Sequence, residues 1–220
     1  MDGIGNVDKI WIGYASDQTV RLNSSSGGII TGSLVALLES GVIDGAVVNV
    51  LDLDMLPWGK SILAKTKEEL MQSSKSIYCV SEIVRGLNLV RDDPTVQKVA
   101  VVGLPCQISN LRQNMSFHNW LCEKVVICIG IMCGHNIYAS TTIEALRESE
   151  VDINDVRRVI YRARGWYPFY YNVEMKDGST KEFLWPKSPL QKTWDSLENL
   201  PYLCKICTDF AAEKADIACC

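Results

Sequence analysis

The sequence predicts an α/β (α+β) fold, in which helices flank a mixed, partly parallel sheet and a smaller mixed-β portion follows. Two observations lead to this prediction. Over the first 150 residues, apolar β-branched runs alternate with stretches of helical periodicity, which is typical of buried, partly parallel strands. After about Val151, strand-like runs dominate, with an Asp177-Gly178 hairpin turn. We therefore predict an α/β domain over residues 1–150 and a mixed-β segment over residues 151–220.

The elements of the first part follow from apolar spacing and from cap signals. Residues 10–15 are β-branched and aromatic, which predicts a first strand. Residues 29–40 carry apolar side chains at helical spacing, after serines suited to an N-cap and before Gly41 as a C-cap. Further strands are predicted at 42–50, 62–64, 98–102 and 125–131, and further helices from 67, at 81–91, at 107–113 and at 140–148.

The second part reads as three strands, at residues 156–163, 170–176 and 180–185. The loop that joins the first two contains Arg164, Gly165 and Trp166. The sequence ends in Ala-Cys-Cys, with neither a helix stop nor a polar tail, and we therefore expect that it is part of a longer protein.

Composition argues against several classes of function. The 22 basic and 26 acidic residues give a net charge of −4, which argues against nucleic acid or an anionic membrane as a partner. No apolar run reaches the roughly 18–20 residues of a membrane span. The first residues lack the basic and apolar regions of a signal peptide. We therefore expect a cytoplasmic protein without a membrane span.

Nine cysteines are the most informative feature of the composition. In a cytosolic chain, so many cysteines indicate metal binding or catalysis rather than a disulfide framework. Cys122 and Cys128 flank or lie in the apolar run 125–131, and we expect both to be core residues, because a free cysteine packs as a small hydrophobe.

Four other cysteines are candidate metal ligands. Cys106 and Cys133 each follow an apolar strand, and open α/β sheets place ligand-binding groups beyond the carboxyl ends of their strands. Cys204 and Cys207 form a C-x-x-C pair near the C-terminus, in what reads as a loop. Four thiolates from three separate segments suit a 4Fe–4S cluster.

The spacing leaves two alternatives to an iron–sulfur cluster open. Structural zinc usually shows two close ligand pairs, whereas one such pair is present and His118 and His135 are not spaced as ligands. The other alternative is a thioredoxin-like dithiol or inert cysteines, although no βαβ pattern follows Cys204.

A serine–glycine loop precedes the first predicted helix. Small residues at a helix N-terminus offer hydroxyls and backbone N–H groups to a phosphate or pyrophosphate, although the same pattern also makes an ordinary N-cap. It is not a G-x-G-x-x-G fingerprint. The loop consists of Ser24, Ser25, Ser26, Gly27 and Gly28. Lys75, which lies farther along the chain, is either a cofactor contact or a solvated lysine.

The loop that contains Arg164 and Trp166 combines a fixed positive charge with aromatic rings. It can stack on a planar ring or pair with an acidic substrate, or it can simply cover the core as a hairpin loop.

Together these stretches resemble one family, the coenzyme F420 hydrogenase/dehydrogenase beta subunits. The matching motifs occur in order along nearly the whole chain: S-S-S-G-G-I-I-T, G-V-I-D-G-A-V-V, G-L-P-C-Q-I, I-G-I-M-C-G-H-N, R-G-W and C-K-I-C-T-D-F followed by A-D-I. The resemblance implies an FAD-binding iron–sulfur subunit that relays electrons between a 4Fe–4S cluster and a substrate, which for many members is coenzyme F420.

The resemblance also implies residue roles. The cluster ligands are Cys106, Cys133, Cys204 and Cys207; the cofactor-binding residues are Ser24, Ser25, Ser26, Gly27, Gly28, Lys75, Gln107, Asn136, Arg164 and Trp166. No catalytic residue is assigned. The implied partner is a hydrogenase, a dehydrogenase or a ferredoxin.

The chain departs from the family pattern in three places. The aromatic loop reads A-R-G-W-Y-P-F and lacks two of the usual glycines. A-D-I is followed by Ala218, Cys219 and Cys220 instead of the usual small residues. The C-x-x-C-x-x-C motif of many relatives is missing.

Two alternative functions are a ferredoxin-dependent reductase of another organic substrate and a zinc-stabilised interaction module without catalysis.

Overall fold

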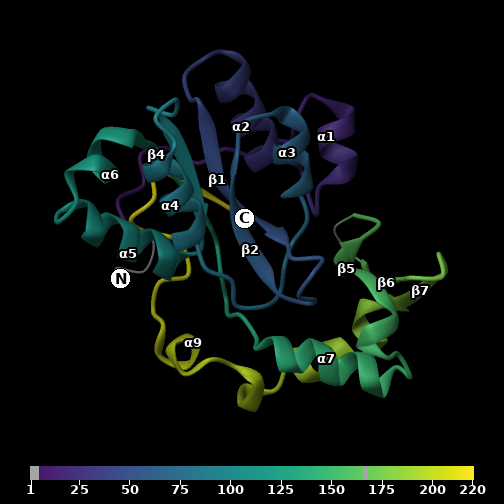
Figure 1. Ribbon diagram of the computed structural model, residues 1–220. Coiled ribbons are helices and arrows are strands. Elements are labelled where there is room, and N and C mark those ends of the chain that lie inside the picture. The colour runs from purple at the N-terminus through teal and green to yellow at the C-terminus, as the bar shows by residue number, and fades with distance from the viewer. Residues whose placement is uncertain (1–4, 166–167) are drawn as a thin grey trace.

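A five-stranded sheet forms the centre of the molecule in the computed structural model, which describes residues 5–165 and 168–220 (Figure 1). The strand order is β2-β1-β3-β4-β8. β1, β3, β4 and β8 run parallel, and only β2 is antiparallel to its neighbour, so the predicted mixed, partly parallel sheet is confirmed. The strands are β1 (Gly45–Leu51), β2 (Gly59–Ala64), β3 (Val99–Gly103), β4 (Val125–Ile131) and β8 (Ile217–Cys219).

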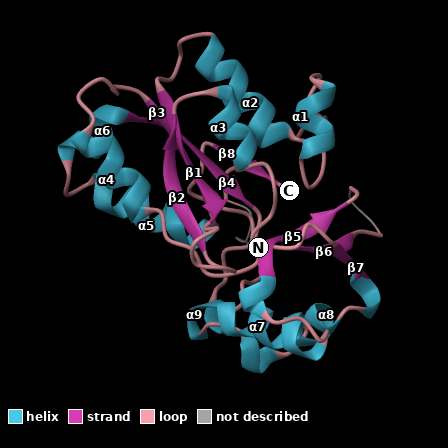
Figure 2. Ribbon diagram, turned by 45° about the vertical axis from the view of Figure 1, so that its right-hand side comes forward, coloured by secondary structure: helices cyan, strands magenta, loops and turns pink. Residues whose placement is uncertain are grey.

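Helices cover both faces of this sheet (Figure 2). The first group is α1 (Gln18–Asn23), α2 (Ile29–Glu39) and α3 (Lys67–Gln72), and the second is α4 (Val84–Asp92), α5 (Pro105–Met115) and α6 (Asn119–Lys124). On β1, Val47 packs into the core beneath the second group, whereas its neighbour Val48 packs beneath the first group, because successive side chains of a strand point to opposite faces. Burial on both faces explains the continuous apolar runs in the sequence.

A second, three-stranded antiparallel sheet follows, with β6 between its neighbours. Its buried Tyr161 and Tyr171 share a core with Leu146 of α7 and Leu190 of α8. The predicted division at residue 150 stays a prediction. The elements are β5 (Val156–Ala163), β6 (Tyr170–Met175), β7 (Thr180–Leu184), α7 (Ala139–Glu148), α8 (Pro189–Trp194) and α9 (Tyr202–Ile206), with short 3₁₀ turns at Ile153–Asp155, Trp185–Lys187 and Leu197–Asn199. Throughout the described residues, no helix has the length and apolar character needed to cross a membrane.

The prediction of a strand at residues 10–15 is wrong. This segment pairs with no strand among the described residues, and most of its apolar side chains are exposed, with Trp11 82% and Ile12 103% exposed. Its end is held instead by a hydrogen bond from the Ala15 N–H to the Gly27 carbonyl (2.8 Å). The prediction that Cys204 lies in a loop is also wrong, because this residue lies in α9.

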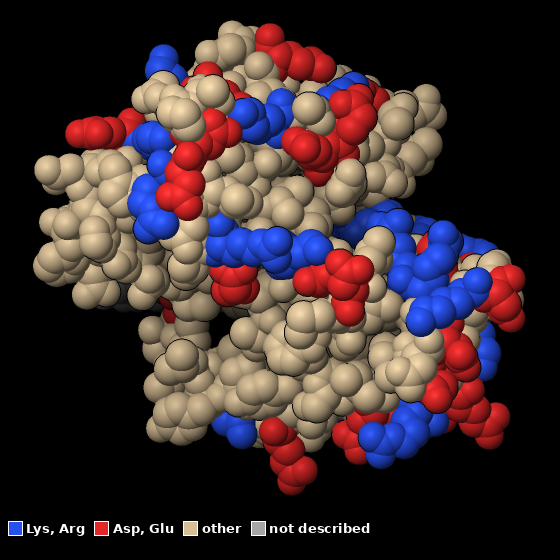
Figure 3. Space-filling model, viewed as in Figure 1, with Lys and Arg blue, Asp and Glu red and all other residues tan. Residues whose placement is uncertain are grey.

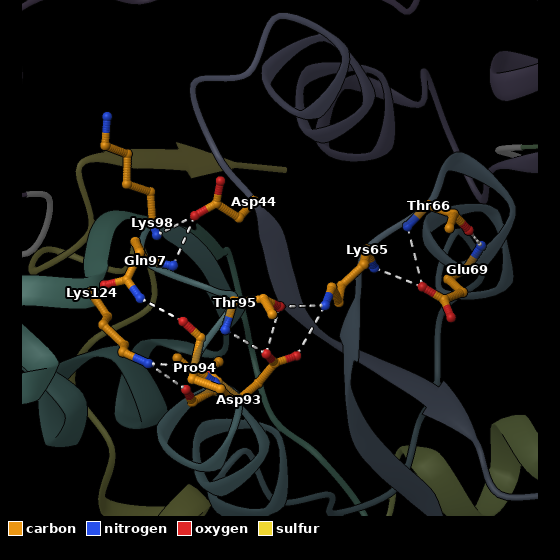
Figure 4. Close-up of polar contacts among 11 residues, drawn as sticks. Asp44, Lys65, Thr66, Glu69, Asp93, Pro94, Thr95, Gln97, Lys98 and Lys124 are labelled. Carbon is orange, nitrogen blue, oxygen red and sulfur yellow. Dashed lines mark hydrogen bonds and ion pairs between the residues drawn. The ribbon is translucent and has the colours of Figure 1, made fainter.

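Polar contacts fix the edge of the sheet at which β1 and β3 begin (Figure 4). The Asp44 carboxylate accepts hydrogen bonds from the backbone N–H groups of Gln97 and Lys98, both at 2.8 Å. On the same edge, the Lys65 ammonium contacts the Asp93 carboxylate at 2.9 Å. The opposite edge, at which the parallel strands end, carries the candidate site.

Candidate functional site

The carboxyl ends of β3, β4 and β8 border a cavity of about 260 Å³. Gly103 ends β3, Ile131 ends β4 and Cys219 ends β8, and all three line the cavity. Because β3 and β4 are parallel neighbours, the segments that follow them lie at one edge of the sheet. This is the position at which open α/β sheets bind ligands.

Most of the sequence-predicted cofactor residues meet in this cavity. Arg164 is not among its lining residues, and Trp166 lies outside the described residues. The predicted residues that line the cavity are Ser24, Ser25, Ser26, Gly27, Gly28, Lys75, Gln107 and Asn136.

The serine–glycine loop is closely packed against its surroundings. Gly28 is the N-cap of α2 and has a φ of +74°, which favours glycine. A Cβ atom at Gly28 would lie 3.0 Å from the Ser24 Oγ, and one at Gly27 would lie 3.2 Å from the Gly13 carbonyl oxygen. The loop therefore presents backbone, without side chains at these two glycines, at the N-terminus of an 11-residue helix whose first N–H groups have no intrahelical acceptor.

Two basic side chains, Lys75 and Arg162, line the same cavity, and no Asp or Glu is found among its described lining residues. The Lys75 ammonium donates to the Ser24 carbonyl at 3.3 Å. Burial lowers the pKa of Lys75, and the nearby charges of Arg158 and Arg162 lower it further. Figure 3 shows basic side chains gathered over β5 and β6, on the side that faces α1 and α3. The cavity therefore combines positive charge with a helix N-terminus, as an anion site does.

Asn49 is a further polar residue on the cavity wall. Its side-chain oxygen Oδ1 is buried and has no hydrogen-bond partner among the described residues. Since buried polar atoms are nearly always hydrogen-bonded, this oxygen can accept a hydrogen bond from a donor group of a ligand. Asn49 is not among the residues predicted from the sequence, although a single asparagine within the apolar run V-V-N-V is a signal that could have identified it.

Gln107 and Asn136 hold the cavity wall in place. The Gln107 side chain accepts from the Leu104 N–H at 2.9 Å and donates to the Ser81 carbonyl at 2.7 Å. The Asn136 side chain donates to the Cys79 carbonyl at 3.1 Å and accepts from the Ile137 N–H at 2.9 Å. Both amides are thus engaged with the backbone and position the segments after β3 and β4.

The four predicted cluster cysteines are neighbours. Burial raises the pKa of Cys133 to about 12, and repulsion from Cys204, Cys106 and Cys207 contributes to the shift. Burial also raises the pKa of Cys106, with contributions from Cys207 and Cys204. A hydrogen bond from the Cys133 N–H to the Phe210 carbonyl (3.0 Å) ties the segment after the C-x-x-C pair to the end of β4. Three separate segments therefore bring the four thiols near enough for their charges to interact.

This group does not have the geometry of a single-ion site. Over the described residues, no three His, Cys, Asp or Glu side chains lie together in a way that could hold one metal ion. A cubane cluster has its irons at separate corners, so its ligands stand farther apart than those of a single ion. The 4Fe–4S cluster stays a prediction.

The remaining cysteines differ in their surroundings. Cys128 is fully buried in β4, as predicted for a core residue. The prediction for Cys122 is wrong: it is exposed on the short helix α6, whose neighbouring Leu121 takes the buried position, and its thiol donates to the Met115 carbonyl. Cys219 and Cys220, which were not predicted as site residues, line the cavity.

Arg164 contacts side chains of β6 and β7 in the second sheet. Its guanidinium contacts the Glu182 carboxylate at 2.5 Å and lies 4.9 Å from the centre of the Tyr170 ring. The neighbouring Arg162, by contrast, reaches the cavity. Arg162 lies in the strand predicted at residues 156–163, whereas Arg164 lies in the loop after it, and the sequence does not show which of the two reaches the cavity.

Comparisons with known proteins identify the family of the chain. Two family models match the chain, one for each part of the coenzyme F420 hydrogenase/dehydrogenase beta subunit: the N-terminal model matches residues 10–88, and the C-terminal model matches residues 96–220. The fold and the site define an α/β protein with a candidate ligand site at the carboxyl ends of its parallel strands. The chain belongs to the coenzyme F420 hydrogenase/dehydrogenase beta-subunit family, as the sequence motifs predicted.

Individual relatives share this family relationship over most of the chain. A coenzyme F420-dependent sulfite reductase of Methanocaldococcus jannaschii is 31% identical over 90% of this chain and 31% of its own length. A coenzyme F420 hydrogenase subunit beta of Methanothermobacter thermautotrophicus is 24% identical over 98% of this chain and 73% of its own length. The chain thus spans about a third of the first of these relatives.

A solved structure shows the same fold. A chain of the F420-reducing NiFe hydrogenase complex from Methanosarcina barkeri superposes with a TM-score of 0.71 at 21% identity, over 97% of this chain and 70% of that chain.

Proposed function

We propose that the chain is an iron–sulfur flavoprotein module that relays electrons between a 4Fe–4S cluster, FAD and coenzyme F420. The observation that carries this proposal is the shared edge of the sheet: the segment after β3 contributes both Cys106 and Gln107, and the segment after β4 contributes both Cys133 and Asn136. Two segments thus connect the four proposed cluster cysteines with the anion-binding cavity. Such proximity is what a relay between two redox groups requires.

The residues of the cavity fit the pyrophosphate of FAD. The N-terminus of α2, Lys75 and Arg162 supply hydrogen-bond donors and positive charge, and no described lining carboxylate opposes an anion. Gly27 and Gly28 allow the phosphate to approach the backbone. The Asn49 Oδ1 accepts a hydrogen bond from an N–H or O–H group of the bound molecule.

The four cysteines fit the cluster. Cys106, Cys133, Cys204 and Cys207 would hold its irons as thiolates. When bound, the two groups together supply the exchange between single electrons and a hydride. The chain's own part is to orient both groups at one edge of the sheet, where Cys133 is partly buried.

Coenzyme F420 as the substrate rests on the names of the relatives, several of which are F420-dependent enzymes or subunits. The electron-transfer partner would be a hydrogenase, a dehydrogenase or a ferredoxin. A ferredoxin-dependent reductase of another organic substrate uses the same two redox groups, and turnover of F420 under anaerobic conditions separates the two functions.

The proposal is tested by anaerobic purification followed by iron, sulfide and FAD analysis. We expect a brown-yellow protein whose absorption is bleached by dithionite. Cys204→Ser should lose most of its iron, because it removes one ligand, whereas Cys122→Ser, the matched change of an exposed cysteine, should retain it. A colourless zinc protein, or equal iron loss in both variants, would contradict the proposal.

A further inference from the structure

Two adjacent cysteines line the cavity, one at the end of the last strand of the central sheet and one directly after it. Cys219 is the final residue of β8 and is in register with Ile131 of β4. Its carbonyl accepts a hydrogen bond from the Met132 N–H at 2.8 Å, which fixes this strand end beside the loop of Cys133. Cys219 and Cys220 both line the cavity, and both are free thiols.

These two thiols are separate from the proposed cluster ligands. Repulsion from Cys220 contributes to the raised pKa of Cys219, after the larger effect of burial, whereas none of the four cluster cysteines is among the causes of that shift. Cys219 is half-buried against the apolar core beneath α2, while Cys220 is exposed to solvent. The pair therefore has one anchored sulfur and one accessible sulfur.

Adjacent thiols in one chain form a chelating pair for soft, thiophilic centres. A single cysteine holds such a centre through one bond, whereas a second sulfur nearby binds intramolecularly, at a high effective concentration. A trivalent arsenoxide is a suitable probe of this chemistry because one arsenic atom forms bonds to two cysteine sulfurs.

We propose that Cys219 and Cys220 form a binding site for a trivalent thiophilic group, and that a group bound there obstructs the anion cavity. With an organoarsenic oxide, two S–H groups add to the arsenic, two As–S bonds form, the As=O bond is broken and its oxygen leaves as water with the two thiol protons. No electrons are transferred, so the step needs no oxidant or reductant.

The obstruction follows from position. Cys219 and Cys220 line the same cavity as the serine–glycine loop and Lys75. An arylarsenic group bonded to both sulfurs must occupy space in that cavity or at its mouth. The binding of the arsenical rests on the thiols alone, whereas its competition with FAD rests on the proposed function.

The experiment uses the full chain under anaerobic conditions with phenylarsine oxide as the probe. Mass spectrometry of peptides should find one phenylarsenic group that bridges Cys219 and Cys220. Cys219→Ser and Cys220→Ser should each lose this adduct in a monothiol wash about a hundredfold faster than the unaltered chain, because the chelate is lost. Cys122→Ser, which alters an exposed cysteine outside the cavity, should keep it.

The C-x-x-C pair can also bind an arsenical, so the location of the adduct decides the outcome. An adduct found only at Cys204 and Cys207, with none on the peptide that carries Cys219, would overturn the site. Peptide mapping of the unaltered chain gives this answer even where a serine variant fails to fold.

Equilibrium dialysis with FAD separates the two claims. Labelling at Cys219 and Cys220 that is slowed by FAD supports the obstruction. A chain that binds FAD equally well with and without the bridging group overturns it. A chain that forms the adduct but never binds FAD supports the thiol site and contradicts the proposed function.

Discussion

At the scale of single residues, Lys75 gives the most direct test of the anion cavity. Lys75→Met removes a half-buried positive charge that faces the serine–glycine loop. A charge-assisted contact of this kind contributes about 1.5 kcal/mol, so we expect the Kd for FAD to rise about tenfold. Iron content should not change, because Lys75 is not one of the proposed cluster ligands. Lys192→Met, at an exposed position on α8, is the control.

The pH dependence of FAD binding should follow the same residue. Because burial lowers the pKa of Lys75, its ammonium deprotonates at a lower pH than an ordinary lysine, and FAD affinity should weaken as the pH rises through that range. Lys75→Met should remove this alkaline decline. An identical decline in the variant would assign it to another group.

Single residues also show where sequence reasoning succeeds and fails. The cluster cysteines and the serine–glycine loop could be predicted because each residue type carries its chemistry and each follows or precedes a predictable element. Arg162 could not be predicted, since the direction of a charged side chain in a strand depends on which face the core covers. Cys122 was misplaced for the same reason, because a six-residue helix exposes one face.

At the scale of elements, the contact between β4 and the segment after the C-x-x-C pair is the feature that brings the proposed cluster cysteines together. A Cβ atom at Gly130 would collide with the Cβ of Ala212 and would lie 3.0 Å from that of Ala215. Ala212 has a φ of +57°, so this segment has little freedom to adjust.

We therefore expect Gly130→Ala to lower the free energy of unfolding by about 1–3 kcal/mol, as overpacking does, and to reduce the iron content. Thermal unfolding and iron analysis provide the measurements. Gly134→Ala is the matched control, because a Cβ there meets no atom within 4 Å. Equal losses in both variants would show that the close packing at Gly130 is not responsible.

The strands themselves show how far apolar patterns define an element. β4 and β5 were predicted at their observed bounds, because a buried run of β-branched residues leaves few alternatives. Residues 10–15 also contain β-branched and aromatic side chains but find no neighbouring strand in the described structure. Strand propensity reports how well a side chain fits a sheet, whereas pairing depends on contacts that are distant in the sequence.

At the scale of the whole molecule, the edge of the central sheet opposite the cavity should determine the response to acid. The Asp93 carboxylate accepts hydrogen bonds from the Thr95 hydroxyl and from Lys65, which lower its pKa to about 2. A lowered pKa means that the folded state binds a proton less readily than the unfolded state. The resulting stability is present above the ordinary value of 3.8 and is lost as the pH falls toward about 2.

Asp93→Asn should therefore lower the melting temperature at pH 7, and its difference from the unaltered chain should shrink steadily as the pH falls below 3.8. Thermal unfolding over this pH range is the measurement. Asp54→Asn, at a side chain that is 93% exposed, should have little effect at any pH. A difference that persists unchanged at the acid end would mean that the lost packing, rather than the charge, is responsible.

The segments after β3 and β4 connect the proposed cluster cysteines with the cavity. They should therefore also couple the binding of the cluster to the binding of the flavin. The segment after β3 holds Cys106 beside Gln107, whose side chain fixes this turn to Ser81, another residue of the cavity wall. Ordering this segment around a cluster orders the wall as well. FAD should therefore bind more weakly to the chain without its cluster, and by linkage FAD should slow the loss of iron to a chelator by the same coupling free energy, about 1–3 kcal/mol.

Titration of FAD into the cluster-loaded chain, the cluster-free chain and Cys106→Ser measures this coupling. The Kd should rise about 5–150-fold in the last two, and Cys122→Ser should behave as the unaltered chain does. Gln107→Leu should reduce the coupling while leaving all four thiols in place, because it releases the turn from Ser81. If FAD binds equally tightly with and without the cluster, the two groups occupy independent sites, and the shared segments give proximity for electron transfer without coupling their binding.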